Sequence, residues 1–563
     1  MQSANMVPVY DALAEDIKAL GTEATFGLMS DDTALLVTAL DSKGVKFHGT
    51  RHENNAISMA EGYAAATGRL GIAILGRGPA AANSIHGATY ALRSGSRVLL
   101  IYGDNPINVA APGNGFGPDS KAFATAAVLG AAGIRSFIAT DAKSARQTLA
   151  TAVAATQAGA TALLLPMNVQ FSNIDFGATT PAPAAAAKPA LKPARAPAIK
   201  AAAALLAASR RPLFVAGLGA HRAGAKESIV RLAEKTGAGL ATTLKGKDMF
   251  RGHPFDAGIL GSFSHAAGRR LIEQADCVVV FGAGLNLRTT SYGLSLPPDI
   301  PVIHVDTMRG TIGRWFHADV ALVTDARLAA EQLYEALPER PAEDKPLHTD
   351  AMRKFLAEFD LASEFQPAHT PRTVDPRTLA LELGKLLPVE RNAVYDSGNF
   401  LQVLPYFPVP GPAHIKCASD FSSIGMGFGC ALGYARGTPE RPTVFFVGDG
   451  SFLMNLGELE TTVREDIPLI IVVMNDCAYG AELHYLKLRD MPVAMSVFPD
   501  IDYAPVAEAF GFQAATVRSL DDLKKLAPML AKPDGPILLD CKITASVVAP
   551  FLLESIEYER NKG

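Results

Sequence analysis

Short apolar runs alternate with longer helical segments along most of the chain. Runs rich in β-branched and aromatic residues predict strands, and the alanine-rich segments between them predict helices. Strands are predicted at Thr25–Gly27, Lys46–His48, Gly71–Leu75, Arg97–Tyr102, Thr161–Pro166, Leu213–Ala216, Ala238–Thr242, Cys277–Phe281 and Val302–Val305. This alternation is typical of parallel sheets with helices on both faces.

Two breaks in this alternation predict three domains. Residues 178–198, ATTPAPAAAAKPALKPARAPA, carry almost no side chains that build a core and enough proline to resist a helix, so they predict an extended linker. A polar, proline-containing stretch over residues 338–375 predicts a second connector. The fold class is therefore α/β, with doubly wound parallel-sheet domains over residues 1–177, 199–337 and 376–563.

A strand, a helix and a second strand are predicted between Val444 and Gly480. The first apolar run breaks at Gly448-Asp449-Gly450, and the second, Pro468–Met474, ends in Asn475-Asp476. The two strands are therefore parallel, with a carboxylate at the carboxyl end of each, which is the edge where α/β sheets bind ligands. Two such carboxylates suit Mg²⁺ carrying phosphate. The alternative is that the Gly-Asp-Gly triplet is only a turn.

A second polar group stands at a strand-to-helix junction near residue 50. The sequence Arg51-His52-Glu53-Asn54-Asn55 precedes an alanine-rich helical segment. Glu53 is either an acid that opens the helix and interacts with its dipole, or a functional carboxyl beside an apolar wall. The glycine-rich turn over residues 75–83, LGRGPAAAN, follows the strand Gly71–Leu75, and such turns most often serve tight packing.

Composition narrows the classes of partner. The chain has 563 residues and a net charge of −4, which provides no basic field for nucleic acid. The five cysteines show no metal-binding spacing, which predicts reduced core thiols in a cytoplasmic protein. The N-terminal segment has neither the basic start nor the apolar stretch of a signal peptide, and no apolar run reaches the roughly 20 residues of a membrane span.

The motifs taken together resemble thiamine diphosphate-dependent enzymes of the acetolactate synthase, benzoylformate decarboxylase and benzaldehyde lyase type. The resemblance rests on RHENNAISMAEGYAAATGR, GRGPAAAN, TTLKGKDMFRGHP and SSIGMGFGCALGYARGTPERPTVFFVGDGSF, and it covers essentially the whole chain. It implies that the first domain binds the aminopyrimidine and the third binds the diphosphate. It also implies a homodimer or homotetramer with the active site between two subunits.

The resemblance assigns roles to individual residues. Glu53 corresponds to the glutamate that pairs with the pyrimidine ring and promotes its imino tautomer. The implied metal ligands are Asp449, Asp476 and the backbone carbonyl of Ala478, although the family usually has asparagine at the position of Asp476. Ile424 corresponds to the apolar residue that bends the cofactor. The further cofactor-binding residues implied are Pro79, Asn83, Ser397, Gly398, Asn399, Gly448, Gly450, Ser451 and Tyr479.

Several departures from the family pattern bear on substrate. Ser120 and Lys121 stand near the Phe-Gln-Glu element of acetolactate synthases, and Arg77 stands where that group usually has serine. Arg77 is predicted either to hold a substrate carboxylate or to stabilise a turn. Glu482 and His484 follow the metal loop and are candidates for acid–base catalysis, although a lone histidine on a helix is more often structural.

The cofactor of the central domain is judged from its glycine loops. The loop Gly217-Leu218-Gly219 departs from a dinucleotide-binding pattern, because its third glycine, Gly224, comes late. In the region that binds flavin in acetolactate synthases, this chain has Gly282-Ala283-Gly284 in place of Gly-x-Arg. FAD is therefore not expected.

The resemblance implies a thiamine diphosphate and magnesium enzyme that adds a small 2-oxo acid, with pyruvate favoured, to the cofactor ylide. It would release carbon dioxide and form an aldehyde or, with a carbonyl acceptor, a 2-hydroxy ketone. The alternatives are an acetolactate synthase, a lyase of 2-hydroxy ketones, and a non-catalytic subunit that binds the cofactor. The acceptor is not predicted, because pocket shape rather than a motif sets it.

Overall fold

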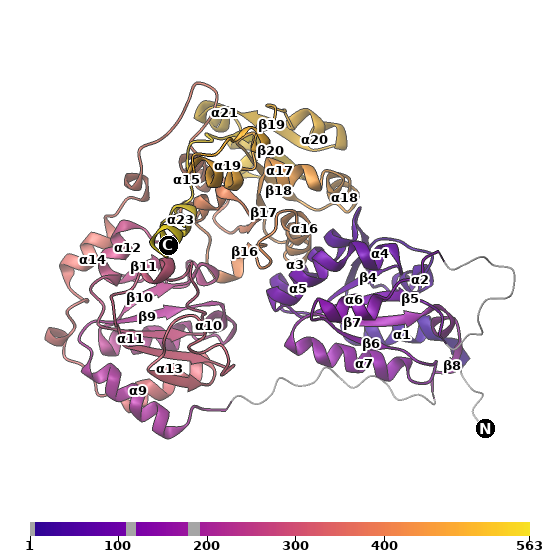
Figure 1. Ribbon diagram of the computed structural model, residues 1–563, viewed down its shortest axis with the longest axis horizontal. Helices are drawn as coiled ribbons and strands as arrows, with labels where there is room; N and C mark the ends of the chain where they lie inside the picture. Colours follow the sequence, from indigo (N-terminus) through magenta and orange to yellow (C-terminus); the bar gives the residue numbers. More distant parts are fainter. Residues whose placement is uncertain (1–5, 108–119, 178–191, 563) are drawn as a thin grey trace.

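The computed structural model describes residues 6–107, 120–177 and 192–562. They form three α/β domains arranged as a triangle, with the first domain at the right of Figure 1, the central domain at the lower left and the third at the top. Each domain contains a six-stranded sheet whose neighbouring strands are parallel, with helices packed on the sheet. The predicted fold class of three parallel-sheet domains is confirmed. Within the described ranges, no helix is long and apolar enough to cross a membrane.

The first domain has the strand order β3-β2-β4-β5-β7-β6. Its strands are β2 (Ala24–Gly27), β3 (Lys46–Gly49), β4 (Gly71–Leu75), β5 (Val98–Asp104), β6 (Arg135–Ile138) and β7 (Thr161–Pro166), and β1 (Met6–Pro8) pairs with β8 (Asn173–Asp175) separately. Its helices are α1 (Val9–Ala19), α2 (Ala34–Ser42), α3 (Glu53–Thr67), α4 (Pro79–Asn83), α5 (Ile85–Ser94), α6 (Thr125–Ala131), α7 (Ala145–Ala155) and α8 (Met167–Gln170).

The central domain has the strand order β11-β10-β9-β12-β13-β14, the order of dinucleotide-binding folds. Its strands are β9 (Pro212–Ala216), β10 (Gly239–Thr242), β11 (Asp256–Ile259), β12 (Cys277–Phe281), β13 (Val302–Asp306) and β14 (Val320–Val323). Its helices are α9 (Ala196–Ala208), α10 (Leu218–Arg222), α11 (Lys226–Thr236), α12 (Ala266–Ile272) and α13 (Ala326–Ala336).

The third domain has the strand order β16-β15-β17-β18-β20-β19. Its strands are β15 (Asn392–Tyr395), β16 (Ile415–Cys417), β17 (Thr443–Gly448), β18 (Leu469–Asn475), β19 (Gln513–Val517) and β20 (Ile537–Lys542). Its helices are α15 (Pro376–Leu386), α16 (Gly427–Gly437), α17 (Asp449–Met454), α18 (Glu458–Arg464), α19 (Gly480–Lys487), α20 (Ala504–Phe510), α21 (Leu520–Lys525), α22 (Ala527–Ala531) and α23 (Pro550–Lys562).

The first and third sheets share one topology. Numbered in chain order within each sheet, the strands lie side by side as second, first, third, fourth, sixth and fifth. In such a sheet the strand order reverses between the first and third strands, and ligands bind in the crevice at that point. The crevice therefore lies between β2 and β4 in the first domain and between β15 and β17 in the third.

The predicted elements and connectors differ from the structure in several places. Strands β1, β6, β8, β11, β14, β15, β16, β19 and β20 were not predicted, and most of them are only three to five residues long. The segment predicted as one helix after Asp449 is two helices, α17 and α18. Residues 178–191 of the predicted linker lie outside the described residues. The last three residues of that linker, 196–198, form the start of α9. The predicted second connector contains the helix α14 (Asp350–Ala357).

Helix α3 of the first domain crosses α16 of the third at very short range. A methyl group on Gly62 would overlap the carbonyl oxygen of Cys430, and one on Gly433 would overlap that of Met59. Both helices are buried along most of their length and belong to one continuous core that joins the two domains. The glycines are therefore required by the close approach of the two backbones.

Replacing Gly433 by alanine is expected to separate these helices and to destabilise the protein by about 1–3 kcal/mol through overpacking. The shift of the urea unfolding midpoint measures this change. Gly130 in α6 is a matched control, because an added methyl group there meets nothing within 4 Å. A Gly433→Ala variant as stable as Gly130→Ala would contradict the proposed role of this crossing.

Candidate active site

A cavity of about 200 Å³ opens at the crevice between β15 and β17 of the third domain. It is lined by Ser397 to Leu401 after β15, by residues 448–451 where β17 passes into α17, and by the loop after β18. The sequence-predicted residues that line it are Ser397, Gly398, Asn399, Ile424, Gly448, Asp449, Gly450, Ser451, Asp476, Ala478, Tyr479 and Glu482. The sequence therefore identified the main part of one cavity.

Two carboxyl groups meet in this cavity. Asp449 opens α17, Asp476 follows β18, and the backbone amide of Ala478 favours the ionised form of both. Burial raises the pKa of Asp449 to about 7. Burial and the neighbouring charge of Asp449 raise the pKa of Asp476 to about 8. Each carboxyl therefore resists ionisation unless a cation lies beside it.

The donor set fits a magnesium ion. The Oδ1 atom of Asp449 is buried and has no hydrogen-bond partner in the described part of the chain. No group of three or more His, Cys, Asp and Glu side chains that could hold a metal occurs among the described residues. Magnesium is commonly held by one or two carboxylates together with phosphate oxygens, so Asp449, Asp476 and the carbonyl of Ala478 fit this ion when a diphosphate is bound.

Asp396 connects the loops that surround the cavity through hydrogen bonds. This fully buried residue follows β15, accepts hydrogen bonds from Ser451 Oγ and from the amides of Ser397 and Gly425, and has a pKa raised to about 6 by burial. Ser422, which lines the cavity, has a φ of 54°, a value that non-glycine residues seldom adopt. Such backbone strain is concentrated at functional sites. The signal by which Asp396 could have been found is a carboxylate directly after the short apolar run Ala393-Val394-Tyr395, which the sequence analysis did not predict as a strand.

The C-terminal segment closes one side of the cavity. Asn399 and Gln402 donate hydrogen bonds to the carbonyl oxygen of Val547, which brings Phe551 and Leu552 to the cavity wall. Arg288 of the central domain lies 4.8 Å from the ring centroid of Phe551 and also lines the cavity. Sequence reasoning missed these three lining residues, because they meet the site only after distant segments fold together.

Glu53 lies in the first domain, outside this lining. It is the first residue of α3, it is 6 % exposed, and Asn83 Nδ2 donates to its carboxylate over 3.3 Å. Asn55 and the amide of Arg51 each donate to Glu458 of α18 over 2.9 Å. The third domain thus fixes the start of the helix that carries Glu53. As far as the described residues show, no residue of the first domain lines the cavity around Asp449.

The remaining predicted residues lie at some distance from the cavity lining. Arg77 Nε donates to Asp32 over 2.9 Å, and Lys121 also pairs with Asp32, at the crevice of the first sheet. His484 is buried on α19 and has a pKa lowered by burial. Pro79 is the first residue of α4. The catalytic roles of Arg77 and His484 stay predictions.

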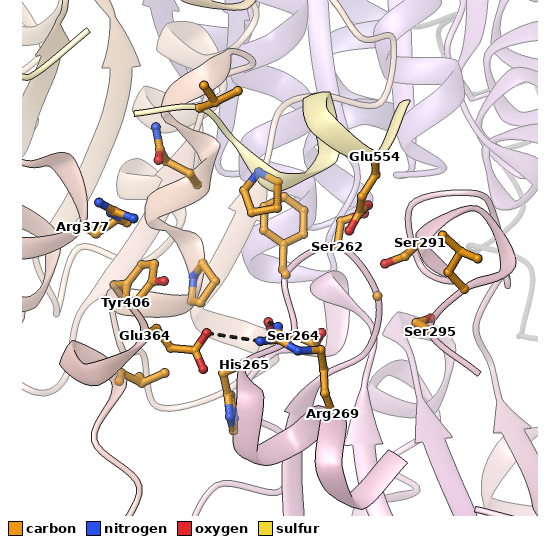
Figure 2. A pocket seen from close by; sticks show the side chains of 18 residues that line it. Ser262, Ser264, His265, Arg269, Ser291, Ser295, Glu364, Arg377, Tyr406 and Glu554 are labelled. Atoms are coloured by element: carbon orange, nitrogen blue, oxygen red, sulfur yellow. Dashed lines mark hydrogen bonds and ion pairs between the residues drawn. The ribbon is translucent and has the colours of Figure 1, made fainter. Parts of the chain in front are cut away.

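A second cavity, of about 430 Å³, lies where the central domain meets the third (Figure 2). Its charged side chains are already engaged: Arg269 with Glu364, Arg377 with Asp375, and Glu554 with Ser262. These charged side chains therefore have partners within the protein and do not require a ligand.

The glycine loops of the central domain pack against each other. Methyl groups on Gly217 or Gly219 would overlap the backbone of Gly282. Close packing of two loops is thus sufficient reason for these glycines, and the expectation that no FAD binds stays a prediction.

Family models match all three domains of the chain. The N-terminal TPP binding domain of thiamine pyrophosphate enzymes matches residues 8–123, the central domain matches 199–333, and the C-terminal TPP binding domain matches 396–541. The chain belongs to the thiamine pyrophosphate enzymes. The implied cofactor, thiamine diphosphate, and the enzymatic nature of the protein follow from this membership.

Curated relatives of this thiamine pyrophosphate enzyme match almost its whole length. A probable acetolactate synthase large subunit of Methanocaldococcus jannaschii is 27% identical, covering 96% of this chain and 93% of the relative. A probable 2-ketoarginine decarboxylase of Pseudomonas aeruginosa is also 27% identical, with 93% and 92% covered. A sulfoacetaldehyde acetyltransferase of Alcaligenes xylosoxydans xylosoxydans is 24% identical, with 97% and 94% covered. Synthase, decarboxylase and acetyltransferase names thus occur at similar identity.

The raised pKa values predict a pH dependence of magnesium binding. In the metal-free protein at pH 7, Asp449 is about half protonated and Asp476 is largely protonated, and Mg²⁺ must displace these protons. Affinity is therefore expected to rise between about pH 6 and about pH 9, with about one to two protons released per ion at pH 7. Calorimetry in two buffers of different ionisation enthalpy measures this release.

Asp476→Asn is the matched variant, because it keeps an oxygen ligand and removes one titrating group. It is expected to release fewer protons and to show a flatter pH dependence. Equal proton release by both proteins would contradict the assignment of Asp476 to the metal site.

Proposed function

We propose that this enzyme uses thiamine diphosphate and Mg²⁺ to decarboxylate a small 2-oxo acid, with pyruvate as the favoured substrate. The product is an aldehyde, or a 2-hydroxy ketone when a second carbonyl compound is the acceptor. The observation that carries the proposal is the meeting of Asp449 and Asp476 in one cavity, where a buried oxygen of Asp449 has no hydrogen-bond partner among the described residues. When bound, the cofactor supplies the nucleophilic carbon that attacks the 2-oxo group.

The third domain would hold the diphosphate end of the cofactor through its metal. Gly448 and Gly450 flank Asp449 and keep the backbone free of side chains there. Ile424 is half-buried in the cavity wall, as a residue that supports the middle of a bent cofactor must be. Phe551 and Leu552 provide an apolar wall that excludes water from the reacting carbon.

Glu53 would act on the aminopyrimidine end. Glu53 is buried at the start of α3, and Asn83 is its one hydrogen-bond donor among the described residues, so its carboxylate can still bond a ring nitrogen. Because the cavity around Asp449 has no lining from the first domain in the described chain, we propose that Glu53 serves the site of a partner subunit in a homodimer or homotetramer. This arrangement accounts for a first domain and a third domain that each contain half of a site.

Arg288 is the cationic side chain of the described cavity lining, whose other charged residues are Asp449, Asp476 and Glu482. It is exposed and stacks on Phe551, so its guanidinium remains accessible to a carboxylate. Arg77 is already paired with Asp32 within the first domain. Arg288 is therefore the better candidate for holding the carboxylate of a 2-oxo acid.

The enzymatic alternatives are an acetolactate synthase and a lyase of 2-hydroxy ketones. The near full-length match to a probable acetolactate synthase at 27% identity favours the first of these as the second candidate. Incubation with pyruvate alone, followed by measurement of carbon dioxide, acetaldehyde, acetoin and acetolactate, separates them. Carbon dioxide release is expected; its absence with all small 2-oxo acids, together with cleavage of a 2-hydroxy ketone, would overturn the proposal in favour of a lyase.

Glu53→Gln is expected to lower turnover by at least about a hundredfold while thiamine diphosphate still binds, because the amide cannot accept or share the proton. Carbon dioxide release and cofactor titration measure the two effects. Glu227→Gln is a matched control, since Glu227 is also an acid in the first turn of a helix, α11, away from the site. Undiminished turnover in Glu53→Gln would leave Glu53 as a helix-opening acid only.

Arg288→Gln and Arg77→Gln, compared in one assay, decide which arginine holds the carboxylate. A hydrogen bond to a charged group contributes about 1.5–3 kcal/mol. Its loss in Arg288→Gln should therefore raise the KM for the 2-oxo acid by at least about tenfold. Its KM for an aldehyde acceptor should change little. A larger effect in Arg77→Gln would transfer this role to Arg77.

A further inference from the structure

A separate cavity of about 490 Å³ lies where all three domains meet. The first domain contributes the ends of α3 and α5, the central domain contributes α10 and the loop after β10, and the third contributes β16 and the turn before it. None of its described lining residues is shared with the cavity around Asp449. The proposed reaction therefore does not account for it.

The charged side chains that line this three-domain cavity are all basic. They are Arg69, Arg97, Arg222, Lys245 and Lys416, to which His221 adds a sixth basic group. Within the described lining there is no aspartate or glutamate. A cavity with walls of one sign of charge concentrates the field and attracts ions of the opposite sign.

Three of these charges are compensated by acids behind the wall. Lys416 donates to the buried Glu61 over 2.7 Å, Arg69 pairs with Glu23 over 2.6 Å, and Lys245 pairs with Asp420. Although burial alone would raise it, the pKa of Asp420 is held below its usual value by Lys416 and Lys245. The acids thus serve as counterions for part of the basic wall.

Arg97 and Arg222 have no such counterion. Neither forms an ion pair within the described ranges, and the Nε atom of Arg97 is buried without a hydrogen-bond partner there. A buried donor without a partner is costly, by about 1–3 kcal/mol, unless a ligand or water satisfies it. The pKa of His221 is lowered by burial and by the positive charge of Arg222, which agrees with an uncompensated field.

Part of the wall is apolar. Leu218, Leu244, Pro412 and Ile415 face the same cavity as the arginines. The volume lies in the range of small-molecule sites, which run from roughly 300 to 1,000 Å³. The cavity thus offers both an anion-binding side and room for an organic group.

We propose that this cavity binds an organic phosphate with at least two negative charges, and that Arg97 and Arg222 bind its phosphate groups. A planar guanidinium donates two parallel hydrogen bonds to phosphate oxygens. Because Arg97 and Arg222 belong to different domains, the ligand links the first and central domains. It therefore stabilises the three-domain arrangement by mass action.

Calorimetric titration of the enzyme saturated with thiamine diphosphate and Mg²⁺ tests the proposal, because the cofactor's own diphosphate site is then filled. The probes are ATP and inorganic diphosphate, at low ionic strength and constant free Mg²⁺. ATP is expected to bind more tightly than diphosphate, since only ATP also contacts the apolar wall. Equal affinity would overturn the assignment of an organic group, and no binding of either probe at millimolar concentration would overturn the site.

Arg97→Gln and Arg222→Gln are each expected to weaken ATP binding by about tenfold, and the double variant by about a hundredfold. Arg222 is exposed, so its replacement leaves the core intact even if Arg97→Gln folds poorly. Arg210→Gln, an exposed arginine of the central domain outside the cavity lining, is the matched control and should bind ATP unchanged. Wild-type affinity in Arg222→Gln and in the double variant would overturn the proposal.

Discussion

The confinement of two carboxyl groups at one sheet edge is the constraint on which the rest of this enzyme depends. Burial disfavours the ionised forms of Asp449 and Asp476, and the charge of Asp449 raises the pKa of Asp476 further. The parallel strands β17 and β18 fix both groups, so neither can withdraw into solvent without disrupting the sheet. A cation bound with a diphosphate would relieve this repulsion, and the hydrogen bonds of Asp396 to Ser451 and Gly425 hold the surrounding loops in place.

The close crossing of α3 and α16 joins the first domain to the third. Glycines on both helices allow backbone contact, and Glu458 of α18 then fixes Arg51 and Asn55 at the start of α3. The carboxyl group of Glu53 is thereby held in place by the domain that carries Asp449 and Asp476 of the same chain. The first and third domains are thus joined through one continuous core.

The sequence was sufficient to predict the strands that are continuous apolar runs, and the functional residues that come directly after a strand or at the start of a helix. β4, β7 and β12 match their predicted bounds, and Asp449, Asp476 and Glu53 lie at the strand and helix ends where the pattern put them. It was insufficient for short edge strands such as β6, whose residues are half exposed and lack alternation. Arg288 and Phe551 were also missed, because their place at the site depends on how the central domain and the C-terminal segment pack on the third domain. The basic cavity at which the three domains meet was not predicted either, because it forms only when the domains pack together.

Subunit complementation tests the central claim, that each active site joins Asp449 of one chain to Glu53 of another. Inactive Glu53→Gln and Asp449→Ala proteins are dissociated, mixed in equal amounts and reassociated, and carbon dioxide release is measured. In random dimers half of the molecules are hybrids with one intact site each, so about a quarter of wild-type activity should return. If Glu53 and Asp449 serve the same chain's site, no hybrid contains an intact pair. Complete absence of activity after verified subunit exchange would then contradict the account.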